Sequence, residues 1–589
     1  MAAAGQIAIA PKLYSDEDKL RLQAEFEAGK PYPHLVLEGF LGEPARQLVR
    51  SDLEKVRADE KETDLFHFFQ TKDLVAACGA TPTGSGVKVR EKKGPARRVR
   101  GAKRRRVQAP VAISAEDVPS LATLIGLFKS VEFRELCQAI TQCGPLSEQV
   151  DLSSQIYPQG GHLLCHDDVI GTRKVSFIYY LSDTDPAWSV EEGGALELYP
   201  GEDGTPAAMP SKELLPCGDS LALFVVEPGV SFHSVREVLG NRARVSIQGW
   251  LHAPSLEETA SYSRRSQATL HQLIGQRKPS GEIPRSPSSR AGGMLQPSAY
   301  STQEEAKLSK YITHEYLDST NLSRIAKRFA DESQVVLSSF LRPECLQPMV
   351  DALVAADAAD GCVNRGMSSG PPNYAAGVNA DWKIVGPPHL RRHLTLTGSA
   401  AKGPASADLA SRLRALVADL FSTSEFRSWL HAATQVEPLG EAPVQVRRFR
   451  PGMDYTVAVC PEQALPTDAS LDVVLTLVGD TSTDAMKQWE SEEVGGFESY
   501  IAADEEETTE VQETYRAADN DGPLINLAVA SNSLSIVLRD AQTLRFTKYV
   551  RHNAPSSRLD VSLSVPAELP DDSESLPAEA QAEKLEEVN

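Results

Sequence analysis

Long apolar runs and paired cysteines are both missing from this chain of 589 residues. No stretch approaches the ~20 consecutive apolar residues that cross a bilayer, so we expect no membrane partner. The N-terminus has neither the positive start nor the apolar run of a secretion signal. Eight cysteines lie between Cys78 and Cys460 with no CxxC spacing, which argues against a disulfide framework or a zinc module. We therefore expect an intracellular protein.

Positive charge is also scarce, except in one segment. The chain holds 60 Lys and Arg against 81 Asp and Glu, and the net charge of -21 argues against nucleic-acid binding by the whole molecule. Residues 88–106 nevertheless include eleven Lys or Arg among nineteen. This basic insertion, about residues 84–108, is a solvated loop, a nuclear import signal or an RNA contact, so direct nucleic-acid binding stays undecided. We expect the protein in both nucleus and cytoplasm.

Short strand patterns dominate residues 150–252. Apolar and polar residues alternate there in stretches that are separated by Gly, Pro and Asp. Closely spaced antiparallel strands of this kind are typical of the double-stranded β-helix, the jelly roll of cupins, whose interior holds a ligand. Helical periodicity precedes them at Ser15–Gly29, after Pro44 and across 114–143. The predicted fold class is therefore mainly β with flanking helices.

The first half of the chain recurs in the second half. Three segments return in the same order at a nearly constant offset: VLEGFL at 36–41 as VLSSFL at 336–341, WSVEEGGALELY at 188–199 as WESEEVGGFESY at 489–500, and the segment from 219 to 238 as that from 532 to 550. This repetition predicts two tandem jelly-roll domains that arose by duplication.

The duplication and the composition together predict where the domains begin and end. The predicted segments are a catalytic domain at 1–252, a Ser/Pro-rich linker at 253–304, the repeated domain at 305–565 and an acidic disordered tail at 566–589.

The residues that predict chemistry begin in YPQGGHLLCHDD, residues 157–168. His166 and Asp168 are two apart, so on one strand both side chains project from the same face. His233, which follows a later strand pattern, is the predicted third ligand. Two histidines and one carboxylate on one side of a metal are the ligands of non-haem Fe(II) oxygenases. His162 and Asp167 compete with the first pair, but the spacing and strand order favour His166 and Asp168.

The repeated domain lacks these ligands. Counting along the aligned repeats, His233 falls on Phe546, and the segment that matches HLLCHDD is DYTVAVC at 454–460, which contains no H-x-D. Only the first domain is therefore expected to bind metal. The second is expected to serve binding or structural support.

Arg244 and Ser246 follow His233 in the next strand pattern and, being two residues apart, face the same way. A guanidinium is a planar fork that suits a carboxylate, and one buried inside a barrel needs a permanent anionic partner. 2-Oxoglutarate supplies this partner, because its distal carboxylate reaches Arg244 while its keto acid end binds iron. The predicted cofactors are thus Fe(II), 2-oxoglutarate and O2.

The order Y-x8-H-x-D, then H-x10-R-x-S, resembles the eukaryotic 2-oxoglutarate- and Fe(II)-dependent prolyl hydroxylases of a small ribosomal subunit protein. The EGG-x-L-x-L turn and the metal-free second jelly roll extend the resemblance over nearly the full chain. It implies 3-hydroxylation, and in some members 3,4-dihydroxylation, of a proline in uS12, with links to translation termination, translational accuracy and oxygen response. It also implies that Tyr157 and Arg244 bind the distal carboxylate of 2-oxoglutarate, that Tyr180 lies in the same pocket, and that ascorbate is the reductant.

Other functions stay open from the sequence. The chain also fits a 2-oxoglutarate oxygenase that acts on a nucleic-acid base or on lysine, which the basic insertion favours slightly. A rival of a different class is a regulatory binding protein that senses oxygen or 2-oxoglutarate and docks a partner through its second domain. Translation-termination factors and RNA–protein complexes are the further partners that the resemblance suggests.

Overall fold

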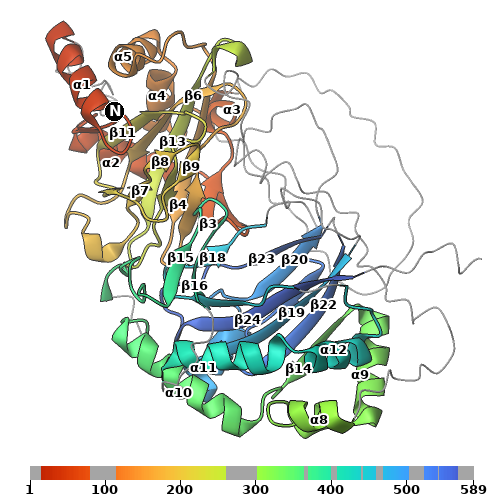
Figure 1. Ribbon diagram of the computed structural model, residues 1–589. Coiled ribbons are helices and arrows are strands. Elements are labelled where there is room, and N and C mark those ends of the chain that lie inside the picture. The colour runs from red at the N-terminus through yellow and green to blue at the C-terminus, as the bar shows by residue number, and fades with distance from the viewer. Residues whose placement is uncertain are drawn as a thin grey trace, which may run out of the picture.

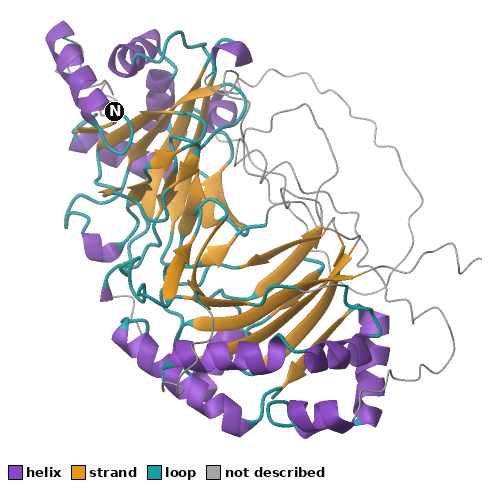
Figure 2. Ribbon diagram, in the orientation of Figure 1, coloured by secondary structure: helices purple, strands orange, loops and turns teal. Residues whose placement is uncertain are grey.

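The computed structural model of the protein contains two large, curled antiparallel sheets with helices against their outer sides (Figure 1; Figure 2), and its described residues form two smaller sheets of three and two strands. The predicted fold class, mainly β with flanking helices, is confirmed. No helix among the described residues is both long and apolar enough to cross a membrane. The predicted basic insertion lies outside the described residues, as do most of the predicted linker and acidic tail. The described residues are 15–79, 114–259, 302–363, 369–398, 408–439, 442–458, 469–502, 523–540 and 543–567.

The first sheet has the strand order β1-β11-β6-β13-β4-β3-β5-β12-β7-β10, with β2 beside β3. Residues of its central strands β4, β6 and β13 are buried along most of their length, because helices cover one face and the barrel interior lies on the other. The bounds of its strands are β1 His34–Glu38, β2 Ala58–Glu62, β3 Phe66–Thr71, β4 Val150–Tyr157, β5 His162–His166, β6 Arg173–Tyr180, β7 Leu196–Leu198, β10 Lys212–Leu214, β11 Ser220–Val225, β12 His233–Val235 and β13 Arg244–His252. A separate two-stranded sheet consists of β8 Gly201–Glu202 and β9 Thr205–Pro206.

The helices of the first domain pack their apolar faces on this sheet. In α5, the Ser130 side chain caps the first turn by accepting a hydrogen bond from the Phe133 N–H. Phe128 of α4 lies 4.8 Å from Phe177 of β6 between ring centroids, and such fully buried aromatic side chains contribute about 1.5–3 kcal/mol each. The helices are α1 Asp16–Ala28, α2 Glu43–Leu53, α3 Leu74–Gly79, α4 Pro119–Phe128 and α5 Val131–Thr141.

The second sheet repeats the strand order of the first. Its order is β14-β22-β19-β24-β17-β16-β15, with β18 beside β16, which matches β1-β11-β6-β13-β4-β3-β2. A separate three-stranded sheet of the second domain, β21-β20-β23, matches β10-β7-β12. The bounds are β14 Gln334–Ser338, β15 Trp382–Val385, β16 Arg391–Leu396, β17 Gln445–Phe449, β18 Tyr455–Thr456, β19 Ala469–Val478, β20 Glu498–Ala502, β21 Ile525–Leu527, β22 Ser533–Asp540, β23 Thr543–Thr547 and β24 Arg558–Ala567. The duplication that the sequence predicted is therefore present in the topology.

Helices also cover the outer face of the second sheet (Figure 1). Their apolar residues join the strands in one large core, which includes Trp429 of α12 and Leu475 of β19. The helices are α8 Thr302–Leu308, α9 Ser319–Glu332, α10 Pro343–Ala359, α11 Leu409–Leu416, α12 Ser424–Thr434 and α13 Thr483–Glu490.

The two domains meet at a buried polar interface. Glu197 of β7 is 1% exposed, and its carboxylate accepts hydrogen bonds from the Tyr374 hydroxyl of the second domain at 2.7 and 3.0 Å. Arg392 of β16 lies over the Tyr374 ring at 3.9 Å from its centroid and donates to the Tyr199 hydroxyl at 3.3 Å. A buried carboxylate that depends on a second-domain hydroxyl links the stability of the two domains.

A second buried carboxylate extends this interface. Glu237 accepts from the Tyr549 hydroxyl at 3.1 Å and from the His552 N–H at 2.8 Å. Burial raises the pKa of Glu237 to about 7, even though both hydrogen bonds favour the charged form. Tyr455, Val457 and Tyr549 also join an apolar cluster of the first domain. The second domain therefore covers a face of the first that would otherwise expose apolar and ionisable groups.

We expect Tyr374→Phe to lower the free energy of unfolding by about 1–3 kcal/mol, because it leaves the buried Glu197 carboxylate short of a donor. Urea denaturation of the full chain measures this loss. Tyr311→Phe is the matched control, since that hydroxyl donates to the exposed Asp419 at 3.1 Å and its removal is expected to change stability by less than about 0.5 kcal/mol. An equal loss of unfolding free energy in the two variants would contradict the conclusion that Glu197 and Tyr374 link the stability of the two domains.

Candidate metal and cosubstrate site

His166 and His233 face each other across two paired strands. Strands β5 and β12 are antiparallel neighbours, and His166 is the Cα partner of His233. The ring centroids are 4.2 Å apart. The Nδ1 of His166 lies 2.8 Å from the Leu164 carbonyl oxygen, and that of His233 lies 2.8 Å from the Ser231 carbonyl oxygen. A carbonyl only accepts, so each Nδ1 carries the proton and each Nε2 presents a lone pair.

Asp168 reaches the same point in a different way from the one predicted. β5 ends at His166, so the expectation that both residues lie on one strand is wrong. Asp168 has a φ of 61°, and this left-handed residue turns its carboxylate back toward the histidines. Its Oδ2 accepts from Ser176 Oγ at 3.1 Å and from Trp250 Nε1 at 3.0 Å. These two donors hold the carboxylate so that Oδ1 stays available.

The three side chains offer a site that fits a divalent metal. Their ligand atoms all lie within 4.8 Å of one another, and all three residues are buried. Neither histidine Nε2 nor Asp168 Oδ1 has a hydrogen-bond partner, which is costly for buried polar atoms unless an ion binds there. Burial alone would raise the pKa of Asp168, but the facing His233 and His166 hold it well below its ordinary value. The aspartate is thus a carboxylate ready to bind a cation.

His162 and Asp167, the competing candidates, lie outside this cluster. The Nδ1 of His162 lies 3.0 Å from the Gly160 carbonyl oxygen, and its ring is 4.4 Å from that of Tyr549. Asp167 accepts from the backbone N–H of Val169 at 3.3 Å. Both residues therefore serve the backbone and the domain interface, and the structure brings together His166, Asp168 and His233 as the sequence predicted.

Arg244 is buried between the two predicted tyrosines. Its guanidinium carbon is 4.8 Å from the Tyr157 ring centroid and 5.1 Å from that of Tyr180. The guanidinium is 3.4 Å from Ser246 Oγ and 3.5 Å from the Tyr180 hydroxyl. Its Nε has no hydrogen-bond partner, and no described carboxylate forms an ion pair with it. A buried cation with only long, neutral contacts is suited to an anionic ligand.

Strand register explains why these four residues meet. Arg244 is the Cα partner of Tyr157, and Ser246 is the partner of Tyr180. The Tyr157 ring faces the guanidinium of Arg244, and its hydroxyl donates to Gln155 Oε1 at 2.7 Å. Sequence reasoning missed Gln155, whose amide lies beside this hydroxyl.

Ser176 and Trp250 were also missed, although they fix the metal-binding carboxylate. They are Cα partners on β6 and β13, far from the H-x-D segment in sequence. No local pattern marks them, since a serine and a tryptophan in strands usually serve packing. Only the pairing of β6 with β13 shows that both point at Asp168, as second-sphere donors that orient a metal ligand do.

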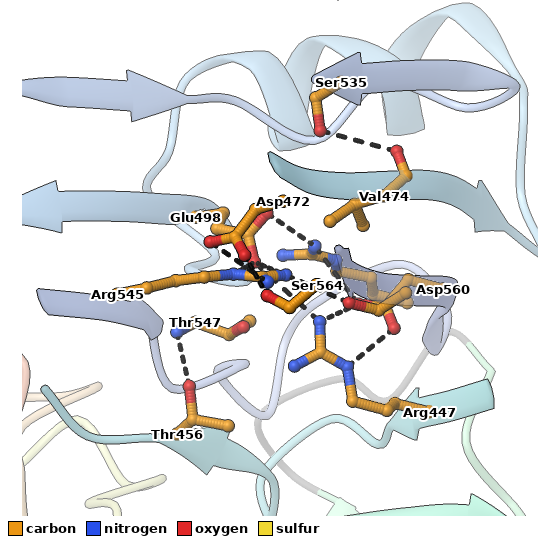
Figure 3. Close-up of polar contacts among 12 residues, drawn as sticks. Arg447, Thr456, Asp472, Val474, Glu498, Ser535, Arg545, Thr547, Asp560 and Ser564 are labelled. Carbon is orange, nitrogen blue, oxygen red and sulfur yellow. Dashed lines mark hydrogen bonds and ion pairs between the residues drawn. The ribbon is translucent and has the colours of Figure 1, made fainter. Parts of the chain in front are cut away.

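The second domain carries an ion-pair network at the place where the first domain has its site (Figure 3). Arg545 is the Cα partner of Tyr500, as His233 is of Leu198. The expectation that His233 corresponds to Phe546 is therefore wrong. Two equivalent backbone hydrogen bonds confirm this register. In the second domain the Lys548 N–H donates to the Phe497 carbonyl, and in the first the Arg236 N–H donates to the Ala195 carbonyl. A loop one residue shorter in the second domain causes the difference.

The network consists of charged pairs that cross the barrel interior. Arg545 is 2.6 Å from Glu498 and 3.6 Å from Asp472. Arg447 binds Asp560 through two contacts of 2.8 Å. These side chains occupy the interior (Figure 3). Asp472 and Ser564 hold the positions of Ser176 and Trp250, and they bond to each other instead of to a metal ligand.

Comparison with known proteins places the chain in a family. A family model described as 2OG-Fe(II) oxygenase superfamily matches residues 152–252, and one described as oxoglutarate and iron-dependent oxygenase degradation C-term matches residues 303–573. Prolyl 3,4-dihydroxylase OGFOD1 of Ostreococcus tauri is 33% identical over 546 residues, which cover 90% of this chain and 94% of that protein. The chain belongs to the OGFOD1 family.

Two further relatives share less sequence identity with the chain. Prolyl 3-hydroxylase OGFOD1 of Mus musculus is 27% identical over 448 residues, covering 69% of this chain and 71% of that protein. Prolyl 3-hydroxylase sudestada1 of Drosophila melanogaster is 24% identical over 545 residues, covering 89% of this chain and 81% of that protein. As an OGFOD1-family oxygenase the chain uses Fe(II), 2-oxoglutarate and O2, and the buried His-Asp-His cluster fits the metal.

We expect Asp168→Asn to weaken metal binding by more than about 100-fold, since changes to outer-sphere groups alone cost 10–100-fold. Titration of the metal-free chain with Mn(II), followed by the loss of the free-ion signal in electron paramagnetic resonance, measures the affinity. Asp167→Asn is the matched control, because Asn keeps an acceptor for the Val169 N–H. Wild-type affinity in Asp168→Asn would show that this carboxylate is not a ligand.

We expect Arg244→Lys to raise the KM for 2-oxoglutarate by about tenfold or more, because an ammonium replaces the planar fork with a point charge. The KM for the protein substrate should stay unchanged. Initial rates at varied 2-oxoglutarate, with succinate as the measured product, separate the two constants. Arg134→Lys, which changes a half-buried arginine of α5, controls for the substitution itself. An unchanged KM in Arg244→Lys would remove Arg244 from the cosubstrate site.

Proposed function

We propose that this chain is a prolyl hydroxylase that acts on a proline of the small ribosomal subunit protein uS12, at the 3-position or at the 3- and 4-positions. The observation that carries the proposal is the buried metal-binding cluster beside an arginine that lacks an anionic partner. The names of the OGFOD1 relatives, which specify prolyl 3-hydroxylase and prolyl 3,4-dihydroxylase, support proline as the target. The resemblance seen in the sequence supports uS12.

In the proposed reaction His166, Asp168 and His233 hold the iron. Arg244, with Tyr180 and Ser246 beside it, binds the distal carboxylate of 2-oxoglutarate. When bound, the iron supplies the oxidising chemistry in which one O2 converts 2-oxoglutarate to succinate and CO2 and a prolyl C–H to C–OH.

The chain's own residues orient and shield that chemistry. Ser176 and Trp250 fix the carboxylate of Asp168 through its Oδ2. The Phe224 ring lies 4.8 Å from that of His233 in an edge-on contact, and it keeps water from one side of the histidine. Both histidines have one tautomer, since their Nδ1–H groups are bonded to backbone carbonyls. The directions of the two Nε2 lone pairs and of the Asp168 carboxylate are thus set before metal or substrate binds.

The same proposal includes the reductant, the cellular compartments and the link to translation. We assign ascorbate as the reductant that keeps the iron in its ferrous state, and the nucleus and cytoplasm as the compartments where uS12 is met. Hydroxylation of a ribosomal proline links oxygen supply to translation termination and accuracy. A purely sensory role in oxygen or 2-oxoglutarate binding is less well supported, because a complete ligand set beside an arginine pocket is more than binding requires.

The test is incubation of the full chain with Fe(II), 2-oxoglutarate, ascorbate and a proline-containing uS12 fragment. We expect a peptide mass gain of ~16 Da per hydroxyl, abolished by His166→Ala. His162→Asn is the matched control, since it alters a buried histidine of the same strand that lies outside the cluster. Succinate release without a change in peptide mass would keep the oxygenase but exclude this substrate, and hydroxylation that survives His166→Ala would exclude the site.

A further inference from the structure

The second barrel keeps an arginine at the position of Arg244. Arg558 is the Cα partner of Phe449, as Arg244 is of Tyr157. The Arg558 guanidinium carbon lies 5.6 Å from the Phe449 ring centroid. Arg558 is 2% exposed, so its charge is held away from water. The duplicated fold has therefore lost the metal ligands but retained the cation that faces the cosubstrate in the first domain.

A cavity of about 240 Å³ opens beside Arg558. It is lined by residues of several strands, including Thr476, Glu498 and Ser535. Thr476 is the Cα partner of Asp560, as Tyr180 is of Ser246. A threonine thus stands where the first domain has the tyrosine that contacts its arginine. The loss of that ring accounts for space next to Arg558 that is large enough for a small organic acid.

The charges around the cavity do not balance. Among the described residues, the network contains the guanidinium groups of Arg447, Arg539, Arg545 and Arg558 but only the carboxylates of Asp472, Glu498 and Asp560.

Arg558 has the longest ion-pair contacts of the four, although its Nη1 donates to the Gly496 carbonyl oxygen. Asp560 binds Arg447 through two contacts of 2.8 Å and reaches Arg558 only at 3.3 Å. Glu498 is 4.0 Å from Arg558 but 2.6 Å from Arg545. The Nε of Arg558 has no hydrogen-bond partner. A buried guanidinium in this state needs one further negative charge.

We propose that the second domain binds a small organic carboxylate in this cavity, with Arg558 as its cationic anchor and Thr476 at its side. A single carboxylate supplies the one negative charge that the network lacks. A phosphate dianion would place both of its charges beside Glu498, whereas a dicarboxylate keeps its second charge a carbon chain away, so the carboxylate is favoured. The site is a binding site without turnover, because the residues at the metal position form ion pairs. The inference does not depend on the identity of the protein substrate.

The experiment uses the metal-free, full-length chain carrying Arg244→Gln, which silences the first site. Isothermal titration calorimetry with succinate, 2-oxoglutarate and inorganic phosphate then reports the second domain alone. We expect one molecule of succinate or 2-oxoglutarate bound per chain, and at least about tenfold weaker binding after Thr476→Tyr, which returns the first domain's residue to the cavity. Thermal melting checks that each variant is folded, and Thr476→Ile replaces Thr476→Tyr if the latter does not fold.

Three results would overturn the proposal. The first is no heat of binding with either acid up to about 10 mM, where even a weak site with a Kd of 1 mM is filled. The second is binding that is unaffected by filling the cavity, which would place the acid elsewhere. The third is phosphate binding as tight as that of the two acids, which would leave a nonselective anion site in place of a carboxylate site. None of these results changes the expected hydroxylation of the uS12 fragment by the unmodified chain.

Discussion

The antiparallel pairing of β5 with β12 is the contact on which the rest of the site depends. It sets His166 opposite His233, and the hydrogen bonds from each Nδ1 to a nearby carbonyl aim both Nε2 lone pairs at one point. The carboxylate of Asp168 completes the cluster only because Ser176 and Trp250, on β6 and β13, hold it from the opposite side. The metal site is thus a property of the closed barrel and of no single segment.

The second domain stabilises the pairing of β5 with β12 through its contacts with the neighbouring strand β7. Strand β12 lies between β5 and β7, and Glu197 of β7 accepts hydrogen bonds from Tyr374 of the second domain as well as from Ser234 of β12. A shift of the second domain would remove the Tyr374 donor from Glu197 and would disturb the strand next to His233. This arrangement explains why a domain without metal ligands stays attached to a catalytic one. Its support is mechanical and is exerted through buried polar contacts, whatever else the domain binds.

Much of this architecture was predictable from the sequence, because repetition and spacing are local signals. The H-x-D pair, His233 and Arg244 were identified from residue type and order, and the duplication from three matching segments. The missed features depend on contacts between distant segments. Asp168 lies beyond the strand in a left-handed conformation, and Ser176 and Trp250 are recognisable only once β6 and β13 are paired. Phe546 was assigned in place of Arg545 because counting along the chain does not detect a shortened loop.

The ion-pair network explains why the second barrel cannot simply regain a metal. Removing one member of a buried ion pair leaves the other uncompensated, at a cost of about 3–5 kcal/mol. Replacing Arg545 by histidine would leave Glu498 without its nearest cation and Asp472 with Arg539 alone, and Asp472 is fully buried. Any single substitution that introduces a metal ligand therefore destabilises the second barrel before a full set of ligands is present. The surplus cation at Arg558 imposes no such penalty on a small anion, so carboxylate binding is the property of the ancestral pocket that this barrel retains most easily.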